Sequence, residues 1–405
     1  MNMENQNISA VQKTVLQLLA HNLFSVPFSP DPDTDWRAVL KESRAQAVNV
    51  IAFQNYAELP LDEELSGDIK KMIRANTMNN IKCFQYHAYL HRLMTENKVS
   101  YCIVKGASSA HYYPDPLLRN MGDVDFFVPQ KDIARAMALL EENGFEKQPS
   151  NHRIHVVFHK GKGHYEMHFK PVALPDGATG KIFMEYWKPI CEDSVLIRDG
   201  LTECRVPDPF LHGFILLSHL QHHLLVEGIG LRHVCDWAVF VNSFSSEEFI
   251  SLFEKRLKRV GLWRLAQLIS LIGTEYLGVT HREWMGDDRE IATALLTDIL
   301  AGGNFGRKDR QRAQEGFFIS DHGKDGVKTN RIVQAFKSLN HIVDSHWKVA
   351  KKFPLLYPFG WAYFSIRYLI RVLLGKRKLN LVDTYVKSGE RKELYKKLNL
   401  FEPEE

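Results

Sequence analysis

The sequence predicts an α+β fold, in which a small mixed sheet is flanked by N-terminal helices and by a larger C-terminal helical region. Apolar residues recur with helical periodicity over residues 1–99 and again from residue 207 onward. Between them, residues 100–206 carry the short apolar or alternating runs that are typical of strands. A chain of 405 residues has room for two or three domains. We therefore expect a helical region (1–99), an α/β core (100–206) and a second helical region (207–405).

The N-terminal part predicts several helices before the first strand. Ser9 is placed to cap a helix that runs to about His21. Apolar residues recur at three- and four-residue spacing from Trp36, and residues 61–98 continue this pattern as one or two further helices. The first strand is therefore expected only after residue 99.

Two strands and a helix open the predicted core. The run "SYCIVK" at residues 100–105 is a short apolar stretch that stops at Gly106. The run "DVDFFV" at 123–128 has apolar residues on both faces, which indicates a strand covered on both sides. Residues 130–145 have helical periodicity and close at Gly144, the residue type that most often follows a helix.

A hairpin completes the predicted core. In "RIHVVFHKGKGHYEMHFK", residues 153–170, two alternating runs meet at the turn residues 161–162, and glycine at the first of these suits a type II′ turn. This turn fixes the strand pairing, because each residue on one side must face a defined partner on the other. It places His155 opposite His168.

From Pro207 the chain returns to helical periodicity, apart from a segment rich in glycine and charge and a long apolar segment. Residues 302–316 contain several glycines and two clusters of charge, so we expect a mobile loop there. The apolar segment 353–378 contains Arg367 and Arg371, which would be costly inside a bilayer. We expect its second half, residues 361–378, to pack on the domain or to lie on an anionic membrane or a partner; both interpretations stay open.

Composition sets limits on the function. A net charge of +4 over the whole chain does not predict a long nucleic-acid footprint. The five cysteines are an odd number without a C-x-x-C pair, which indicates reduced, mostly buried thiols. The N-terminus has no basic stretch followed by an apolar run, so we expect no signal peptide and a cytoplasmic protein.

Two carboxylates stand on the second predicted strand. Asp123 and Asp125 are two residues apart, so they point to the same face and repel each other. A shared divalent cation removes this cost, and Mg²⁺ binds one or two carboxylates while leaving positions for phosphate oxygens and water. Glu166, on the polar face of the second hairpin strand, is the candidate third acid. The three acids together could hold two ions.

The turn after the first strand predicts an anion site. Gly106 ends that strand, and Ser108 and Ser109 follow at the start of a predicted helix. Free backbone N–H groups at a helix N-terminus favour an anion, and a serine hydroxyl can add a hydrogen bond.

Two basic residues flank this turn. Lys105 and Arg119 could contact a phosphate, but each has a structural alternative. Lys105 could extend from the strand edge into solvent. Arg119 could form an ordinary salt bridge with Asp115 or Asp123.

Histidines are numerous near these motifs, and their roles are less defined. His168 shares a face with Glu166 and could support a metal-bound acid or a phosphate, or belong to a solvated polar face. Arg232 and Asp236 are four apart, which predicts an intrahelical ion pair or a lining for a nucleotide base. One predicted helix carries four more histidines, which lack an evident third zinc ligand and fit helix-surface or buried positions better: His212, His219, His222 and His223.

Together these motifs resemble those of a known superfamily. The stretch "VKGASSAHYYPDPLLRNMGDVDFFV" followed by "YEMHF" is similar to the polymerase-beta-like nucleotidyltransferases, and most to the bacterial family of uncharacterised nucleotidyltransferases. The shared features are a Lys-Gly strand end, a Tyr-Pro…Arg stretch, Gly-Asp-hydrophobic-Asp and an acid-x-His strand. The usual Gly-Ser pair of the superfamily is here Gly106-Ala107-Ser108, which shifts the serine by one position.

The resemblance implies a reaction and roles for the acids. Asp123 and Asp125 would bind Mg²⁺, with Mn²⁺ as an alternative, together with the triphosphate of ATP or another NTP. Glu166 would bind the catalytic ion and help to deprotonate an acceptor hydroxyl. An NMP would be transferred and pyrophosphate released. The substrate would be contacted by Lys105, Gly106, Ser108, Ser109, Arg119 and His168.

The acceptor is not identified by the sequence, although a small molecule or a protein fits the moderate charge better than a nucleic acid. Two other functions stay open. A non-catalytic nucleotide-binding scaffold would have no need of three converging acids, and a phosphotransferase would use the same metal site but release a nucleoside diphosphate.

Overall fold

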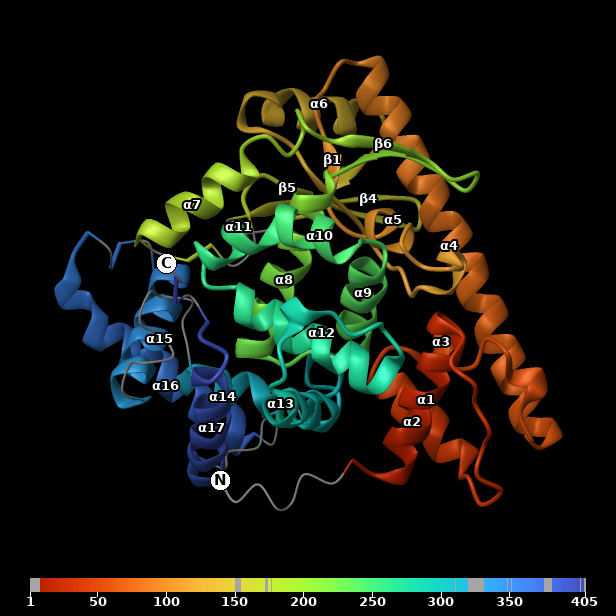
Figure 1. Cartoon of the computed structure of the whole chain (residues 1–405). Coiled ribbons are helices and arrows are strands. Elements are labelled where there is room, and N and C mark those ends of the chain that lie inside the picture. Colours follow the sequence, from red (N-terminus) through yellow and green to blue (C-terminus); the bar gives the residue numbers. More distant parts are fainter. Residues whose placement is uncertain are drawn as a thin grey trace.

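A mixed five-stranded sheet and a separate two-stranded hairpin make up the strands of the computed structural model (Figure 1). In the sheet, of order β1-β2-β5-β4-β3, β2 and β5 are parallel and the other pairs are antiparallel. Its strands are β1 (Cys102–Ile103), β2 (Val124–Phe127), β3 (Glu146–Lys147), β4 (His155–Lys160) and β5 (Gly163–His168). The hairpin pairs β6 (Val195–Arg198) with β7 (Glu203–Val206). The predicted α+β class and mixed sheet are confirmed.

The structure describes most of the chain. The described residues are 8–149, 154–171, 174–175, 177–309, 311–319, 331–347, 349–350, 352–374, 381–400 and 402–403.

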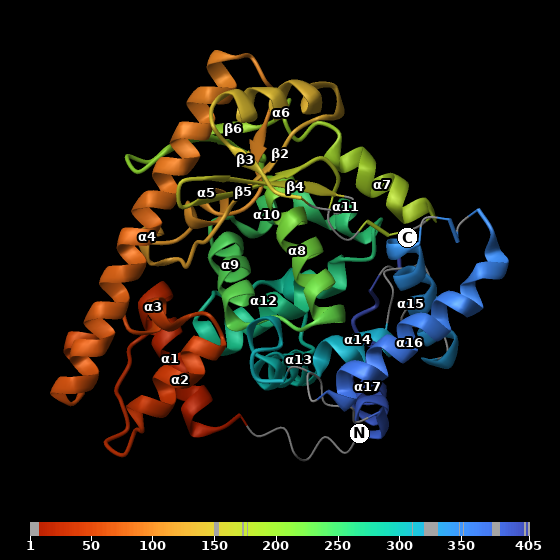
Figure 2. The same cartoon turned by 180° about the vertical axis from the view of Figure 1, so that it is seen from behind.

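In the part of the chain that the structure describes, four α-helices precede the sheet: α1 (Ala10–Phe24), α2 (Trp36–Ala45), α3 (Asn49–Ala52) and α4 (Glu63–Glu96). Ser9 caps α1 as predicted, because its side chain accepts from the backbone N–H of Gln12 while the Gln12 side chain bonds back to the Ser9 backbone. Residues 61–98 contain a single helix of 34 residues, α4. It runs along one side of the molecule from the N-terminal helices to the sheet (Figures 1 and 2).

The remaining helices accompany the sheet or follow it. Within the predicted core these are α5 (Ala107–Ala110), α6 (Ile133–Glu142) and α7 (Gly177–Trp187). After the hairpin come α8 (Pro209–Val226), α9 (Leu231–Asn242), α10 (Ser246–Phe249), α11 (Lys255–Lys258), α12 (Trp263–Leu277), α13 (Arg289–Gly302), α14 (Arg312–Ile319), α15 (Arg331–His346), α16 (Tyr357–Leu373) and α17 (Leu381–Lys396). Helices α8 and α9 lie beneath the sheet in both views (Figures 1 and 2).

Strand β2 lies between two clusters of buried apolar side chains. Phe126 belongs to the cluster formed by the sheet with α4 and α6. Phe127 belongs to a larger cluster that joins α1 and α2 to α8, α9, α12 and α13, and its ring lies 5.5 Å from that of Trp187. The strand is therefore covered on both sides, as predicted. Because Asp125 points the same way as Phe127, its carboxylate faces the C-terminal helical region.

Much of the described part of 302–316 is helical and is joined to α13 by a buried ion pair, so the segment is not the loop that its glycines predicted. Helix α14 begins at Arg312, whose guanidinium is buried and donates to both oxygens of Asp298, at 3.0 and 2.8 Å. Arg312 belongs to the charged residues from which a mobile loop was predicted, but it is paired with an acidic residue of α13.

Two expectations about the chain as a whole can be compared with the structure. The five cysteines are free and four of them are buried, as predicted. Among the described residues, no helix combines the length and the apolar character needed to cross a membrane.

Candidate active site

The pairing of β2 with β5 sets two of the predicted acids side by side. Asp125 pairs with Glu166 in the parallel register, so both carboxylates lie on the same face of the sheet. Asp125 is almost fully buried, whereas the side chain of Glu166 is 23% exposed. Asp123 stands just before β2, and one of its oxygens lies within 4.8 Å of Glu166 and of a ring nitrogen of His164. The predicted convergence of Asp123 and Glu166 is thus present in the geometry.

The β4–β5 hairpin adds histidines to this face. Its register pairs His155 with His168 and His159 with His164, as the glycine turn predicted. A nitrogen of His155, a nitrogen of His168 and an oxygen of Glu166 also lie within 4.8 Å of one another. The polar face of the hairpin is therefore directed at the acids.

Asp125 is held by two basic side chains. His168 Nε2 lies 2.9 Å from Asp125 Oδ1, and Lys105 Nζ lies 3.6 Å from Asp125 Oδ2. Burial acts to raise the pKa of Asp125, but Lys105 and His168 outweigh it and hold the pKa well below its usual range. Asp125 is therefore ionised at neutral pH although it is buried.

The neighbouring groups are shifted by the same contacts. His168 Nε2 also lies 3.6 Å from Glu166 Oε2, and this contact lowers the pKa of Glu166. Burial acts to lower the pKa of His168, but hydrogen bonds to Asp125 and Glu166 outweigh it and raise the pKa. Burial and the charge of Asp125 raise the pKa of Asp123. A cation between these acids would oppose the last of these shifts.

The donor atoms of this face fit a divalent cation. Carboxylate oxygens of Asp123, Asp125 and Glu166 are the ligands that Mg²⁺ prefers. Imidazole nitrogens of His155 and His168 lie near the Glu166 carboxylate, and one of His164 lies near Asp123 and Glu166. Imidazole nitrogen extends the range of suitable ions toward Mn²⁺ and other transition metals. The residues present are thus consistent with the predicted Mg²⁺ and with its Mn²⁺ alternative.

The two serines after β1 have different surroundings. Ser108 Oγ lies 2.7 Å from His212 Nδ1 in a buried contact. Ser109 Oγ is buried without a hydrogen-bond partner and lines a pocket. Of the two predicted phosphate ligands, Ser109 is the one whose hydroxyl is available.

Gly106 is required by two features of this turn. Its φ of +64° with ψ of −114° is a conformation that other residues rarely adopt. A Cβ atom at this position would also lie only 2.7 Å from His87 Nε2. The glycine therefore lets the chain pass His87 before entering the single turn of α5.

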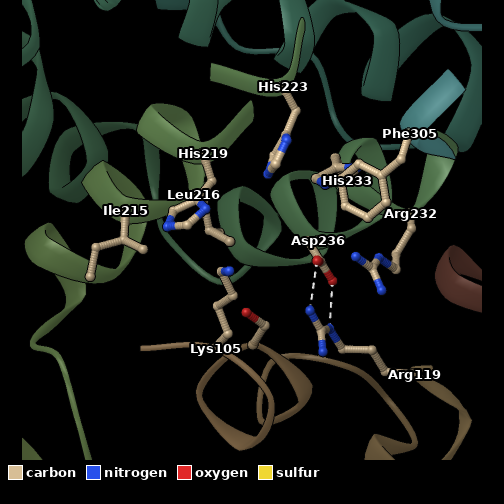
Figure 3. A pocket seen from close by; sticks show the side chains of 11 residues that line it. Lys105, Arg119, Ile215, Leu216, His219, His223, Arg232, His233, Asp236 and Phe305 are labelled. Atoms are coloured by element: carbon tan, nitrogen blue, oxygen red, sulfur yellow. Dashed lines mark hydrogen bonds and ion pairs between the residues drawn. The ribbon is translucent and has the colours of Figure 1, made fainter. Parts of the chain in front are cut away.

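The pocket lies between this turn and the C-terminal helices (Figure 3). Lys105 enters it from the sheet side, and the histidines of α8 face it from the opposite side (Figure 3). The lining residues are Lys105, Ser109, Arg119, Ile215, Leu216, His219, His223, Arg232, His233, Asp236 and Phe305. Two of the four histidines without a defined role, His219 and His223, thus face the same pocket as Lys105.

Arg119 is committed to a salt bridge that the sequence did not indicate. Its Nε and Nη2 donate to the two oxygens of Asp236 at 2.7 and 2.8 Å (Figure 3). The Tyr113 hydroxyl also donates to Asp236, at 2.7 Å. All three side chains are buried. The predicted alternatives, a pair with Asp115 or Asp123, are therefore wrong. The predicted intrahelical pair is also wrong, because Asp236 receives Arg119 instead of Arg232.

Sequence reasoning missed the partners that approach from far along the chain. Asp236 and His212 contact residues more than one hundred positions away, which local spacing cannot reveal. Phe305, at the mouth of the pocket, fell in the segment predicted as a mobile loop. The glycines at 303 and 306 could have indicated a tight turn at Phe305, because both adopt a positive φ.

Comparison with known proteins gives one match. The sequence profile of the family described as uncharacterised nucleotidyltransferase matches residues 32–278, more than half of the chain. The matched range includes the three acids and all the pocket residues except Phe305. No curated protein and no solved structure matches.

Proposed function

The chain belongs to the uncharacterised nucleotidyltransferase family, and from this premise we propose that it transfers a nucleoside monophosphate from an NTP to a hydroxyl acceptor. The observation that carries the proposal is the parallel register of Asp125 with Glu166, with Asp123 within reach of Glu166. Three acids on one face of a covered sheet repel each other unless a cation joins them. A site of this kind suits phosphoryl chemistry, in which positioning and charge do most of the work.

In the proposed reaction the acceptor oxygen attacks the α-phosphorus in line. A bond forms between that oxygen and the α-phosphorus, the bond to the β-phosphate oxygen breaks, and pyrophosphate leaves with the electron pair. Asp123, Asp125 and Glu166 would hold Mg²⁺ or Mn²⁺, which when bound stabilises charge on the attacking and leaving oxygens. Glu166, which is more exposed than Asp125, lies beside the acceptor hydroxyl and accepts its proton. His168 and Lys105 orient Asp125 through the contacts described above.

Labelled nucleotides test the proposal. Purified protein is incubated with Mg²⁺, a cell extract and each NTP, ATP first, labelled in the α- or the γ-phosphate. We expect α-label to appear on an acceptor and γ-label to appear in pyrophosphate. Transfer of γ-label would establish a phosphotransferase instead. Binding of Mg·NTP without transfer of either label to any acceptor would favour a non-catalytic nucleotide-binding protein. The size of the labelled product separates small-molecule and protein acceptors from nucleic acids.

We also propose that α16 contacts an anionic membrane surface. One face of the helix packs on α15, where Tyr357 donates to Asp344 and Trp361 donates to Asn340. Side chains on the opposite face recur every three or four residues and are largely exposed: Phe359, Tyr363, Ile366, Ile370 and Leu373. Such a face is typical of a helix that lies in the plane of an interface.

Charge supports a membrane as the occupant. Residues 345–382 contain no Asp or Glu, and their eight basic residues are Lys348, Lys351, Lys352, Arg367, Arg371, Lys376, Arg377 and Lys378. Each basic residue near an anionic surface adds about 1 kcal/mol of attraction. Residues 375–378 of the predicted segment lie outside the described residues.

Vesicle flotation tests this contact. We expect the full chain to float with vesicles that contain phosphatidylserine, and to float less in high salt or with neutral vesicles. The double variant Phe359→Ser/Leu373→Ser should stay in the soluble fraction. Met78→Ser on α4, which also removes an exposed apolar side chain, is the control. Dimers that depend on Phe359 and Leu373, without flotation, would instead identify a second copy of the chain as the occupant.

A further inference from the structure

The pocket in Figure 3 contains a positive charge without a matching carboxylate. Arg232 Nε is buried and has no hydrogen-bond partner. The only carboxylate among the lining residues is Asp236, and both of its oxygens are taken by Arg119. Burial, followed by the nearby charge of Arg119, lowers the pKa of Arg232 and outweighs the opposing charge of Asp236. A bound anion would compensate the buried positive charge of Arg232.

Neutral hydrogen-bonding groups in the same pocket also lack partners. The side chains of Ser109 and His219 are more than nine-tenths buried, and Ser109 Oγ and His219 Nδ1 have no hydrogen-bond partner. Buried polar atoms of this kind cost free energy unless a ligand satisfies them. They approach from opposite sides, Ser109 from the turn after β1 and His219 from α8. Their convergence indicates a bound group with several oxygen atoms.

We propose that this pocket binds the terminal phosphates of the nucleoside triphosphate, and the pyrophosphate that leaves, with Arg232 as the main cationic ligand. The inference rests on the proposed function and names the residues of the C-terminal helices that complete its substrate site. Lys105 connects the two parts, because it lies 3.6 Å from Asp125 and also lines the pocket. An anion that extends from the acids along Lys105 therefore reaches Arg232 and Ser109.

Arg119 acts here as a positioning residue. Arg119 forms a bidentate bridge to Asp236, which lies on α9 one helical turn after Arg232. The bridge therefore fixes the part of α9 that carries Arg232. The substrate role that the sequence suggested for Arg119 thus falls to Arg232, whose Nε has no hydrogen-bond partner. Arg suits this role because its fixed fork of donors matches phosphate oxygens.

Calorimetry of pyrophosphate binding in EDTA tests the inference. Without a divalent cation the three acids repel pyrophosphate and cannot bind it. The measured affinity therefore reflects the contacts that pyrophosphate makes in the pocket. We expect Arg232→Met to weaken pyrophosphate binding by about tenfold or more, and Ser109→Ala to weaken it several-fold. The thermal stability of ligand-free Arg232→Met should be unchanged or higher, because an unpaired buried charge is removed. Arg74→Gln, an exposed charge on α4, is the matched control and should change the affinity less than twofold.

Further measurements separate this inference from the proposed function. Pyrophosphate affinity that is the same in wild type, Arg232→Met and Ser109→Ala would overturn the pocket assignment, even if wild type transfers α-label. Adenosine that binds with an affinity sensitive to Arg232→Met, while pyrophosphate does not, would overturn it in favour of a base site. Pyrophosphate binding that depends on Arg232 would support the assignment even in a protein that transfers no label. Ser109→Ala provides the readout if Arg232→Met does not fold.

Discussion

Glu166→Gln is expected to reduce nucleotidyl transfer by a factor on the order of 10² or more while leaving NTP binding nearly intact. The substitution keeps the size and hydrogen-bonding capacity of the side chain and removes its charge. Asp123 and Asp125 still bind the metal–triphosphate, whereas the negative charge beside the acceptor hydroxyl is lost. Single-turnover transfer of α-label and calorimetry with Mg·NTP measure the two quantities separately.

The control for this variant is Glu142→Gln, on the exposed surface of α6, which should alter neither quantity. Equal losses of binding and of rate in Glu166→Gln would contradict the assigned role and place Glu166 in the ground-state metal site. The pKa shift fixes the relevant charge state: contact with His168 lowers the pKa of Glu166, so the carboxylate is ionised throughout the neutral range.

Local pattern was sufficient for the elements that carry the acids. Apolar residues on both faces placed Asp125 on a covered strand, and the glycine turn at 161–162 set the register of His155 with His168. Both signals act within a few residues, because strand periodicity and turn geometry depend on the adjacent backbone. The polar face of the second hairpin strand also made Glu166 the candidate third acid. That this strand pairs in parallel with β2 and sets Glu166 opposite Asp125 is known only from the structure.

The other half of the site depends on contacts between distant segments. Arg119 had two acids close by in sequence, yet it pairs with Asp236, which lies 117 residues later. Ser108 is likewise taken by His212 from α8, which leaves Ser109 toward the pocket. Periodicity identifies the face on which such a residue lies, but it does not identify which helix covers that face. The pocket could therefore be assigned only once α8 and α9 were placed against the sheet.

Arg119→Met is expected to lower the free energy of unfolding by about 3–5 kcal/mol, because it leaves Asp236 as a buried carboxylate without its cation. Replacing both residues, as Arg119→Met/Asp236→Leu, should recover a large part of this loss, since no buried charge then remains unpaired. Urea unfolding at neutral pH measures these differences. Arg37→Met, which breaks exposed contacts with Asp62 and Glu64, should cost less than about 1 kcal/mol.

Acid titration gives an independent test of the same ion pair. Burial acts to raise the pKa of Asp236, but Arg119 outweighs it and lowers the pKa to about 2. A carboxyl whose folded-state pKa lies below its unfolded value of about 3.9 stabilises the fold above that value and loses this contribution as the pH falls. Wild type should therefore lose about 2–3 kcal/mol through this group between about pH 5 and 1, a loss that the double variant lacks. Two results together would contradict this role of the bridge: Arg119→Met is no more destabilising than Arg37→Met, and wild type and the double variant lose the same free energy of unfolding in acid. In that case the bridge does not hold α9 in place, and other contacts must position Arg232.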